Sequence, residues 1–421
     1  VATISGDNLK ANPVADISQA IQGRLAGVVV TAQDGRPGAS IDIRVRGGGS
    51  VTQSNAPLYI VDGIILSLTS EHLPFDNEID AENLYLSPGF IDIHTHGGGG
   101  YDFGDGDTES ILLAAKTHFK HGTTTIFPTC TSSSHNDMLN CIRLTREAMR
   151  LEDDLTPHIE GAHLEGPYFS LKQSGAQNPE YIKAPDKKEY EEFFSAGEGT
   201  LRRISFAPEL EGSLELCRFL HEHNIVSAFA HTDAIYEEIM PCINEGCRLA
   251  THLYSGMNMV TRRNAYRKLG AVETAFLCDN VTVEVIADGC HLPPELLKLI
   301  YKIKGASRIA LVTDSMRGAG MPEGPSVLGP KNDGMDCIIT NGVAMLPDMS
   351  AFAGSVATAD RLVRTMYKLC GIPLTECIKM MCETPARVMN IKKRGKLLEG
   401  YSADIVLFDD NINIKRVIKG K

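Results

Sequence analysis

SPGFIDIHTHGGGG, at residues 87–100, is the stretch of this sequence that says most about the fold. Residues 90–96 form a short, largely apolar run, typical of a strand that is buried on both faces. His94 and His96 are two residues apart, so a strand would place both imidazoles on the same side. Neutral imidazole is the commonest metal ligand in proteins, and the glycines let the backbone turn away without a Cβ. A lone His-x-His can also be two unrelated histidines. Residues further along the sequence are needed to distinguish this from a metal-binding pair.

The rest of the sequence repeats one unit, in which an apolar strand has a polar or glycine-containing end and is followed by a helical stretch. The candidate strands are Phe90–His96, Thr123–Cys130, His158–Glu165, Arg203–Glu209, Ile225–His231, Arg248–Tyr254, Thr282–Asp288 and Arg308–Asp314. Helical patterns lie between them, as at Ser110–His121, Asn136–Leu151, Gly212–His223 and Pro294–Ile303. Eight such units in about 300 residues predict an α/β fold, a (β/α)8 TIM-type barrel.

Side chains that could carry chemistry collect at the C-terminal ends of these strands, where TIM barrels build their active sites. They are His94, His96, Glu165, Glu209, His231, His252, His291 and Asp314. Glu165, His231 and His252 together suit Zn²⁺ or another divalent ion and leave a position for water. His94 and His96 could bind a second ion, with Glu165 between the two. Taken singly, each histidine could instead be a hydrogen-bonded core or surface residue.

Asp314 ends the last candidate strand, in the sequence LVTDS. A metal ion lowers the pKa of a bound water and polarises the attacked carbonyl, and a nearby carboxylate can take the proton and pass it to a leaving group. The alternative is an aspartate that caps the next helix. The buried, apolar strand before Asp314 favours the catalytic role.

Composition narrows the range of partners and locations. The net charge of -12 argues against a nucleic-acid partner, although it allows a local basic pocket for an anionic substrate. No run approaches the length of a membrane span, and no signal-peptide pattern opens the sequence. The 11 cysteines have no paired spacing, which predicts reduced thiols, mostly packed in the core, and a cytoplasmic protein.

Seven motifs within residues 83–421 resemble those of the N-acetylglucosamine-6-phosphate deacetylases of the amidohydrolase superfamily. They are SPGFIDIHTHGGGG, GAHLEGPYFS…SGAQNPEYI, HTDA, THLYSGMN, ADGCHLPPELL, LVTDSMRGAG and AFAGSVATAD. The resemblance implies that Glu165, His231 and His252 bind the essential metal and that Asp314 is the catalytic acid or base. Because His94 and His96 are kept, it also allows a second ion. The implied metal is Zn²⁺, with Fe, Co or Mn as alternatives, and the implied assembly is a homodimer.

The resemblance also implies contacts with the substrate. Arg263 matches an arginine that grips the sugar phosphate, often across a dimer interface, and a guanidinium fork suits phosphate oxygens. The alternative interpretation is that Arg263 is a solvated surface charge. The other matched positions are Ser255 and Gly256 at the phosphate, Ala176 and Gln177 beside the sugar, His291 at the reacting amide, and Phe352, Ala353 and Gly354 at the N-acetyl group.

The implied reaction is hydrolysis of N-acetylglucosamine 6-phosphate to glucosamine 6-phosphate and acetate, with Asp314 and His291 as the catalytic residues. Two alternatives stay open. One is a deacetylase for another N-acetylated sugar phosphate, such as the galactosamine isomer. The other is an envelope protein that uses a plug domain to bind a partner.

The second alternative arises from residues 1–64, which carry QGRLAGVVV, GRPGAS, IRVRGGGS and SNAPLYIVDG. These motifs resemble the plug of TonB-dependent outer-membrane receptors of the SusC/RagA type, and the resemblance implies a plug fragment. Residues 88–387 would form the barrel, while residues 65–87 and 388–421 would form the remnant of a small β-domain. We expect this β-domain to be incomplete, because plug-like sequence replaces its N-terminal strands.

Overall fold

The computed structural model describes residues 28–32, 41–45, 59–61, 64–66, 81, 84–332, 334–349 and 352–420. The chain divides into two compact units, one comprising Val1–Pro88 with Lys396–Lys421 and the other Gly89–Gly395. In the first unit, β1 (Val28–Ala32) pairs with β2 (Ile41–Val45) and β3 (Tyr59–Val61) with β4 (Ile64–Leu66), both antiparallel. Most of the plug-like segment lies outside the described residues.

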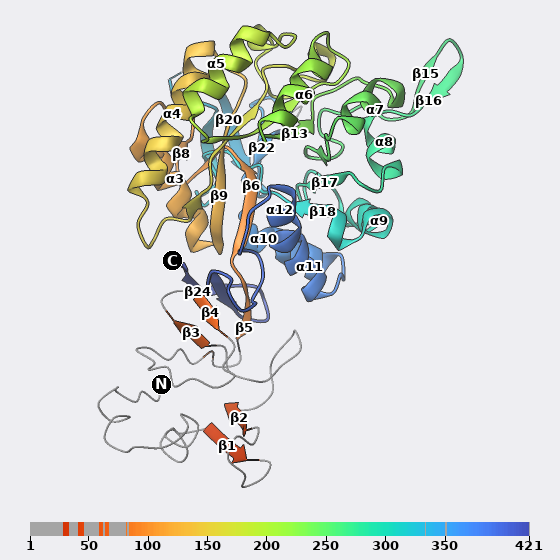
Figure 1. Cartoon of the computed structure of the whole chain (residues 1–421). Coiled ribbons are helices and arrows are strands. Elements are labelled where there is room, and N and C mark those ends of the chain that lie inside the picture. Colours follow the sequence, from red (N-terminus) through yellow and green to blue (C-terminus); the bar gives the residue numbers. More distant parts are fainter. Residues whose placement is uncertain are drawn as a thin grey trace. The chain divides into compact units, whose positions relative to one another are not determined.

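The second unit is built on parallel strands (Figure 1). Their hydrogen-bonded order is β6 (Phe90–Thr95), β9 (Thr123–Cys130), β11 (Ala162–Glu165), β12 (Leu201–Phe206), β13 (Val226–Phe229), β14 (Leu249–Ala250), β17 (Thr282–Val285) and β18 (Ile309–Leu311). The short β10 (His158–Ile159) also pairs with β9. Beyond β18, the amide of Asp314 donates to the carbonyl of His94 at 2.9 Å, which links the last strand position to the first. The predicted TIM-type barrel is confirmed.

Helices follow the strands and cover them on the outside (Figure 1). They are α3 (Thr108–Lys120), α4 (His135–Leu151), α5 (Lys187–Gly197), α6 (Ser213–Glu222), α7 (Tyr236–Asn244), α8 (Ala271–Leu277), α9 (Pro294–Lys304), α10 (Ala359–Arg364), α11 (Leu374–Met381) and α12 (Glu383–Val388). Capping side chains mark two of the starts, because Asp107 accepts from the amide of Ser110 and Ser134 from that of Asp137. No helix in the described residues is both long and apolar enough to span a bilayer.

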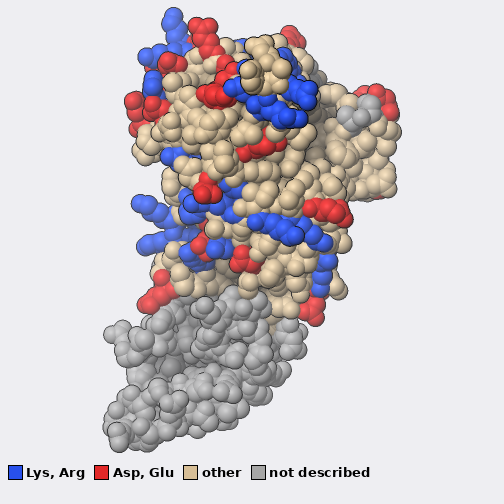
Figure 2. Space-filling model, turned by 90° about the vertical axis from the view of Figure 1, so that its right-hand side faces the viewer, with Lys and Arg blue, Asp and Glu red and all other residues tan. Residues whose placement is uncertain are grey.

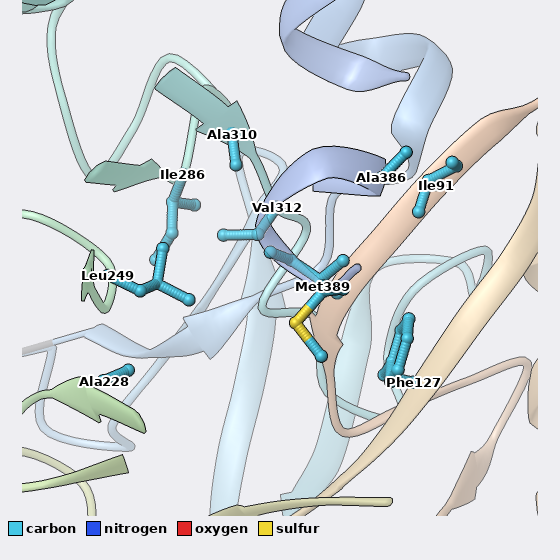
Figure 3. Packing of buried hydrophobic residues seen from close by; sticks show 10 residues of the cluster. Ile91, Phe127, Ala228, Leu249, Ile286, Ala310, Val312, Ala386 and Met389 are labelled. Atoms are coloured by element: carbon cyan, nitrogen blue, oxygen red, sulfur yellow. The ribbon is translucent and has the colours of Figure 1, made fainter. Parts of the chain in front are cut away.

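An apolar cluster packs residues of several barrel strands against Ala386 of α12 (Figure 3). Its strand residues precede the polar ones on the same segments, as Ile91 precedes His94 and Leu249 precedes His252. The cluster comprises Ile91, Ile93, Phe127, Ala228, Leu249, Ile286, Ala310, Val312, Ala386 and Met389. Residues that alternate along the chain with members of this cluster, such as Asp92 and Thr313, are also fully buried, so the barrel is a packed core and not a pore.

Two antiparallel sheets with three or four strands are described in addition to the barrel. One, inserted between β18 and α10, has the order β19 (Gly324–Leu328), β20 (Met335–Thr340), β21 (Val343–Met345) and β22 (Phe352–Ser355). The other belongs to the first unit and has the order β24 (Ile414–Ile418), β23 (Ile405–Phe408) and β5 (Tyr85–Pro88). The rings of Tyr85 and Phe408 stack in it, with centroids 5.7 Å apart. Only β5 joins the C-terminal strands of this sheet from the N-terminal side, among the described residues.

The cysteines differ from expectation at one pair. Cys130 and Cys141 form a disulfide, with α-carbons 6.6 Å apart, so the expectation of reduced thiols is wrong here. Cys130 ends β9 and Cys141 lies in α4, and the short connection between them brings the two α-carbons within bridging range. Of the other nine cysteines, most are buried.

Candidate metal centre and active site

Glu165 is the centre of a group of ionisable side chains at the C-terminal ends of the barrel strands. Its Oε1 lies 2.8 Å from Nε2 of His252 and 3.2 Å from Nε2 of His231. The three side chains are buried, and their potential ligand atoms all lie within 4.8 Å of one another. One carboxylate and two imidazoles that converge in this way suit a divalent ion such as Zn²⁺.

His94 and His96 approach the same carboxylate from β6. Nε2 of His96 lies 3.2 Å from Oε2 of Glu165 and 3.1 Å from Oδ1 of Asp314. Nε2 of His94 lies 3.3 Å from the same Oδ1 and 3.6 Å from Oε1 of Glu165. His94, His96 and Glu165 form a second group with metal-ligand spacing, and His94, His252 and Asp314 form a third. We call these six residues, namely Glu165, His94, His96, His231, His252 and Asp314, the Glu165 cluster.

The Glu165 cluster has the features of a metal site. Nε2 of His94 is buried and has no hydrogen-bond partner among the described residues, which is costly unless a metal binds there. Burial opposes protonation of His94, but the carboxylates of Asp314 and Glu165 outweigh it and raise the pKa of His94 to about 9. Burial likewise opposes ionisation of Glu165, yet the charge of His94 holds the pKa of this carboxyl well below its usual range. Protons on the histidines thus neutralise the negative charge of the carboxylates, and a divalent cation can replace these protons.

Three residues of the cluster stand in an unusual backbone conformation. The φ angles of His231, His252 and Asp314 are 42°, 25° and 45°. The predicted strands ran through these residues, whereas the ladder ends before each of them because the backbone has turned out of the extended region. Residues other than glycine avoid positive φ, and strain of this kind is found mainly at functional sites.

Asp314 is the most accessible member of the cluster. Its side chain is 17% exposed, against 8% or less for the partners it contacts. Burial would raise the pKa of Asp314, but the charges of His94 and His96 lower it to about 2. Asp314 is therefore ionised at neutral pH and can accept a proton from a molecule that enters the site.

Two supporting residues were missed in the sequence. Glu284 on β17 places its Oε2 3.1 Å from Nδ1 of His94, and its Oε1 is ion-paired with Arg203 on β12. All three side chains are fully buried. Burial opposes ionisation of Glu284, but the charge of Arg203 outweighs it and lowers the pKa of the carboxyl. The sequence did contain a clue to these two residues. Each is a charged residue inside a strand that was expected to be buried on both faces.

Glu209, which the strand pattern also singled out, lies outside the cluster. The hydroxyl of Thr232 donates to its Oε2 at 2.6 Å, and the amide of Asp233 donates to its Oε1 at 2.7 Å. Glu209 therefore holds the turn that follows His231. Gly256 packs against the other side of this turn, because a Cβ there would lie 2.6 Å from Nδ1 of His231.

The structure brings Gln177 to the metal centre. Its Nε2 donates to Oε2 of Glu165 at 2.7 Å, and its Oε1 accepts from the amide of Ser132 at 2.9 Å. Gln177 is buried, whereas the neighbouring Ala176 is exposed. Of the two residues expected beside the sugar, Gln177 thus uses both polar groups of its side chain within the protein.

His291 and Phe352, which were both expected at the substrate, lie together. Their rings are in contact, with centroids 4.9 Å apart. Nδ1 of His291 lies 2.7 Å from Oδ2 of Asp288, a residue that the sequence reading did not single out. Phe352 is exposed on β22, and Ala353 beside it is buried while Gly354 is half-buried.

Arg263 lies apart from these residues, on a projecting hairpin formed by β15 (Thr261–Arg263) and β16 (Tyr266–Lys268) (Figure 1). It is exposed, and its Nη1 lies 2.9 Å from Oε1 of Glu238. Figure 2 faces this side of the molecule and shows Lys and Arg side chains gathered toward the top, where the hairpin lies. Ser255 and Gly256 follow His252 directly, and the amide of Ser255 donates to the carbonyl of His252 at 3.0 Å.

Known proteins resemble the chain over most of its length. N-acetylglucosamine-6-phosphate deacetylase of Lysinibacillus sphaericus is 30% identical over 86% of this chain and 91% of its own length. N-acetylgalactosamine-6-phosphate deacetylase of Escherichia coli O157:H7 is 29% identical over 86% and 92%. A solved structure of a variant of the Mycobacterium smegmatis N-acetyl-D-glucosamine-6-phosphate deacetylase, in complex with N-acetyl-D-glucosamine-6-phosphate, superposes with a TM-score of 0.78 at 30% identity, over 86% of this chain and 92% of that one.

Two families match the chain, and the matches meet close to Pro88, the first boundary between the two compact units. Residues 1–86 match the TonB-dependent Receptor Plug Domain. Residues 85–420 match the Amidohydrolase family, and they contain the barrel and every residue of the Glu165 cluster. A barrel whose strand ends carry histidines and carboxylates at metal-ligand spacing is consistent with this match. The chain belongs to the amidohydrolase family.

Proposed function

We propose that the chain is a metal-dependent deacetylase that hydrolyses the acetamido group of N-acetylglucosamine 6-phosphate, giving glucosamine 6-phosphate and acetate. The observation that carries the proposal is the convergence of four histidines on Glu165, beside an accessible and ionised Asp314. The relatives about 30% identical to this chain that are compared above match it over most of their length and are named as sugar-phosphate deacetylases.

We assign the metal ligands within the Glu165 cluster. Glu165, His231 and His252 would hold one divalent ion, and His94 and His96 would hold a second with the same glutamate. A bound ion would polarise the amide carbonyl and lower the pKa of water. Ligation by imidazole nitrogens and a carboxylate oxygen favours Zn²⁺, and the same ligands are compatible with Fe, Co or Mn.

Asp314 and His291 would carry out the proton transfer and the positioning. The Asp314 carboxylate accepts the proton of the attacking water and returns it to the leaving amine, which needs an ionised and accessible group. Asp288 fixes the orientation of the His291 ring through Nδ1, and the ring would hold the substrate near the reacting amide. Asp314→Asn should remove the proton acceptor without removing the histidines that bind metal.

The substrate would lie between the cluster and the loops around it. Phe352, Ala353 and Gly354 would pack on the N-acetyl group next to His291. The main chain at Ser255 and Gly256, together with Arg263, would bind the phosphate, and Ala176 would lie beside the sugar. We place Gln177 at Glu165 and not at the sugar, because both of its polar groups are engaged within the protein. Arg263 lies on an exposed hairpin, which supports a homodimer in which it reaches the phosphate in the partner's site.

The direct test is acetate release from N-acetylglucosamine 6-phosphate by the purified chain, first stripped of metal and then resupplied with Zn²⁺. We expect activity to disappear with the metal and to return with it. A folded chain that releases no acetate with Zn²⁺, Fe²⁺, Co²⁺ or Mn²⁺ would exclude this activity. Circular dichroism of each preparation shows whether an inactive sample is folded.

A second candidate substrate is N-acetylgalactosamine 6-phosphate, because the relatives include deacetylases named for that sugar at nearly the same identity. The two sugars differ only in the orientation of one hydroxyl, and both carry the same amide and phosphate. A comparison of kcat/KM for the two decides between them, and the sugar with the larger value is the substrate.

We infer that residues 1–64 are a fragment of a SusC/RagA-type plug and take no part in the chemistry, since the Glu165 cluster lies within residues 94–314. A sugar phosphate is charged and does not cross membranes unaided, so we propose that the chain acts in the cytoplasm. An envelope role for the plug-like segment would instead place the chain in the membrane fraction of fractionated cells, and recovery there would overturn this location.

A further inference from the structure

A chain of three ionisable side chains crosses the barrel interior beneath the Glu165 cluster. Arg203 on β12 pairs with Oε1 of Glu284 on β17, and Oε2 of Glu284 lies 3.1 Å from Nδ1 of His94 on β6. None of the three is exposed to solvent. The amide of His252 also donates to Oε2 of Glu284, at 3.3 Å. Glu284 therefore contacts two residues of the cluster, namely the ring of His94 and the backbone amide of His252.

The remaining contacts of Arg203 fix the position of this carboxylate. Nη1 donates to the carbonyl of Ile93 at 3.2 Å, and Nη2 donates to Oγ1 of Thr251 at 2.9 Å and to Oγ of Ser205 at 3.3 Å. Ile93 and Thr251 are the residues immediately before His94 and His252. A buried ion pair gives little net stability compared with a well-packed apolar core, so stability alone does not account for Arg203 and Glu284.

The contact with Glu284 determines which nitrogen of His94 can face the cluster. A carboxylate that accepts from Nδ1 keeps the proton on that nitrogen and leaves the lone pair on Nε2. Nε2 of His94 is the nitrogen that lies near Asp314 and Glu165, and it is buried with no hydrogen-bond partner among the described residues. The other ring nitrogen is thus held in place while Nε2 is left for a ligand.

We propose that Glu284, anchored by Arg203, is a positioning residue that sets the tautomer and orientation of His94 and thereby retains the ion bound by His94 and His96. The proposal rests on the metal centre proposed above. It assigns no contact with substrate to Glu284 or Arg203, because both act only through His94 and the segment at His252. Removing this support should weaken chiefly the ion at His94 and His96, because Glu284 reaches His252, a ligand of the other ion, only through its backbone amide.

The substitution Glu284→Gln tests this directly, because it changes the hydrogen bonding at nearly constant volume. Both carboxylate oxygens of Glu284 face donors, and an amide has only one oxygen. The guanidinium of Arg203 is the strongest donor, so we expect the amide oxygen to face Arg203 and the NH₂ group to face His94. Nδ1 of His94 must then give up its proton, and the proton moves to Nε2, where it blocks the metal.

The measurement is titration of the metal-free chain with Zn²⁺ by calorimetry, with bound metal counted after dialysis. We expect two ions in the wild-type chain and a 10- to 100-fold weaker affinity for one of them in Glu284→Gln. The double variant Arg203→Met with Glu284→Gln should regain part of that affinity, because its amide can turn the oxygen toward His94. If the pair served only for packing, the double variant would bind no better than the single one.

Glu189→Gln is the matched control, because Glu189 is also a buried carboxylate, hydrogen-bonded to Tyr168 and Lys183, but contacts no member of the cluster. It should bind both ions as the wild type does. Equal affinities in wild type, Glu284→Gln and control would overturn the positioning role and leave the proposed function intact. A wild-type chain that binds no ion at all would instead overturn the metal centre, and the positioning role with it.

The wild-type chain also gives an answer without any variant. In the Zn²⁺-loaded chain labelled with ¹⁵N-histidine, His94 should carry its proton on Nδ1 and bind metal through Nε2. A His94 whose Nδ1 carries no proton would refute the proposal, even if the variants failed to fold.

Discussion

His118 gives a pH dependence of stability that can be worked out from the structure. It lies on α3 and is fully buried. Its Nε2 lies 2.9 Å from the carbonyl of Gly97, while Nδ1 is buried with no hydrogen-bond partner among the described residues. A second ring proton would therefore have no acceptor, and burial lowers the pKa of His118 to about 4. The folded chain keeps His118 neutral where an unfolded chain would protonate it.

The sign and size of the effect follow from this difference. Above the unfolded pKa of about 6.5 neither state is protonated at His118, and its contribution to stability is fully present. As the pH falls toward the folded pKa of about 4, the unfolded state binds a proton that the folded state does not, and stability is lost. Between about pH 7 and about pH 5, the free energy of unfolding should fall by about 2 kcal/mol on account of this one residue.

The substitution His118→Gln isolates this contribution, since glutamine does not titrate and can still donate to the carbonyl of Gly97. Urea unfolding of the metal-free chain, with chelator present, is measured for both proteins from pH 8 to pH 5. The difference at pH 8 gives the cost of repacking, which does not depend on pH. The wild type should lose about 2 kcal/mol more than the variant on going to pH 5. Parallel curves over the whole range would refute the reasoning.

Three further outcomes are expected at the site. Asp314→Asn should lower kcat about 100- to 10,000-fold while the metal content measured after dialysis stays the same, and a fully active variant would remove Asp314 from proton transfer. Gln177→Leu should weaken Zn²⁺ binding about tenfold in a calorimetric titration, because Oε2 of Glu165 loses its donor, and unchanged binding would return Gln177 to a role at the sugar. Arg263→Ala should raise KM for the phosphorylated sugar about 10- to 100-fold and leave KM for unphosphorylated N-acetylglucosamine unchanged. Lys268→Ala, on the same hairpin, is the control. An equal effect on both sugars would exclude a phosphate contact.

The barrel could be predicted because each strand is apolar and ends in a polar residue. This alternation of strand and helix depends on burial alone, and the structure follows it closely, as at Thr123–Cys130 and Pro294–Lys304. The cluster could be predicted for the same reason, since a barrel brings together whatever its strands carry at their C-terminal ends. Residues far apart in the sequence, such as His94 and Asp314, thereby lie 3.3 Å apart.

The supporting groups could not be predicted because their meaning depends on what lies across the barrel. Glu284 and Arg203 stand inside strands, and nothing in the sequence shows that each faces the other. Gln177 lies in a loop, where periodicity gives no information about direction. The disulfide between Cys130 and Cys141 was not predicted for a related reason, because sequence spacing does not show how close two α-carbons lie in the fold.

The positive φ angles at His231, His252 and Asp314 have an evolutionary consequence. Each costs of order 1–3 kcal/mol in a residue other than glycine, so a library of variants sorted only for survival of heat should accumulate glycine or asparagine at these turns. Every such gain would delete a proposed metal ligand or the proposed proton acceptor. Sorting for turnover would instead restore the original three residues at the expense of heat resistance. Sequencing these positions after each kind of selection, and comparing the heat resistance of the two sets of variants, would therefore show how much stability the protein loses by keeping the three original residues.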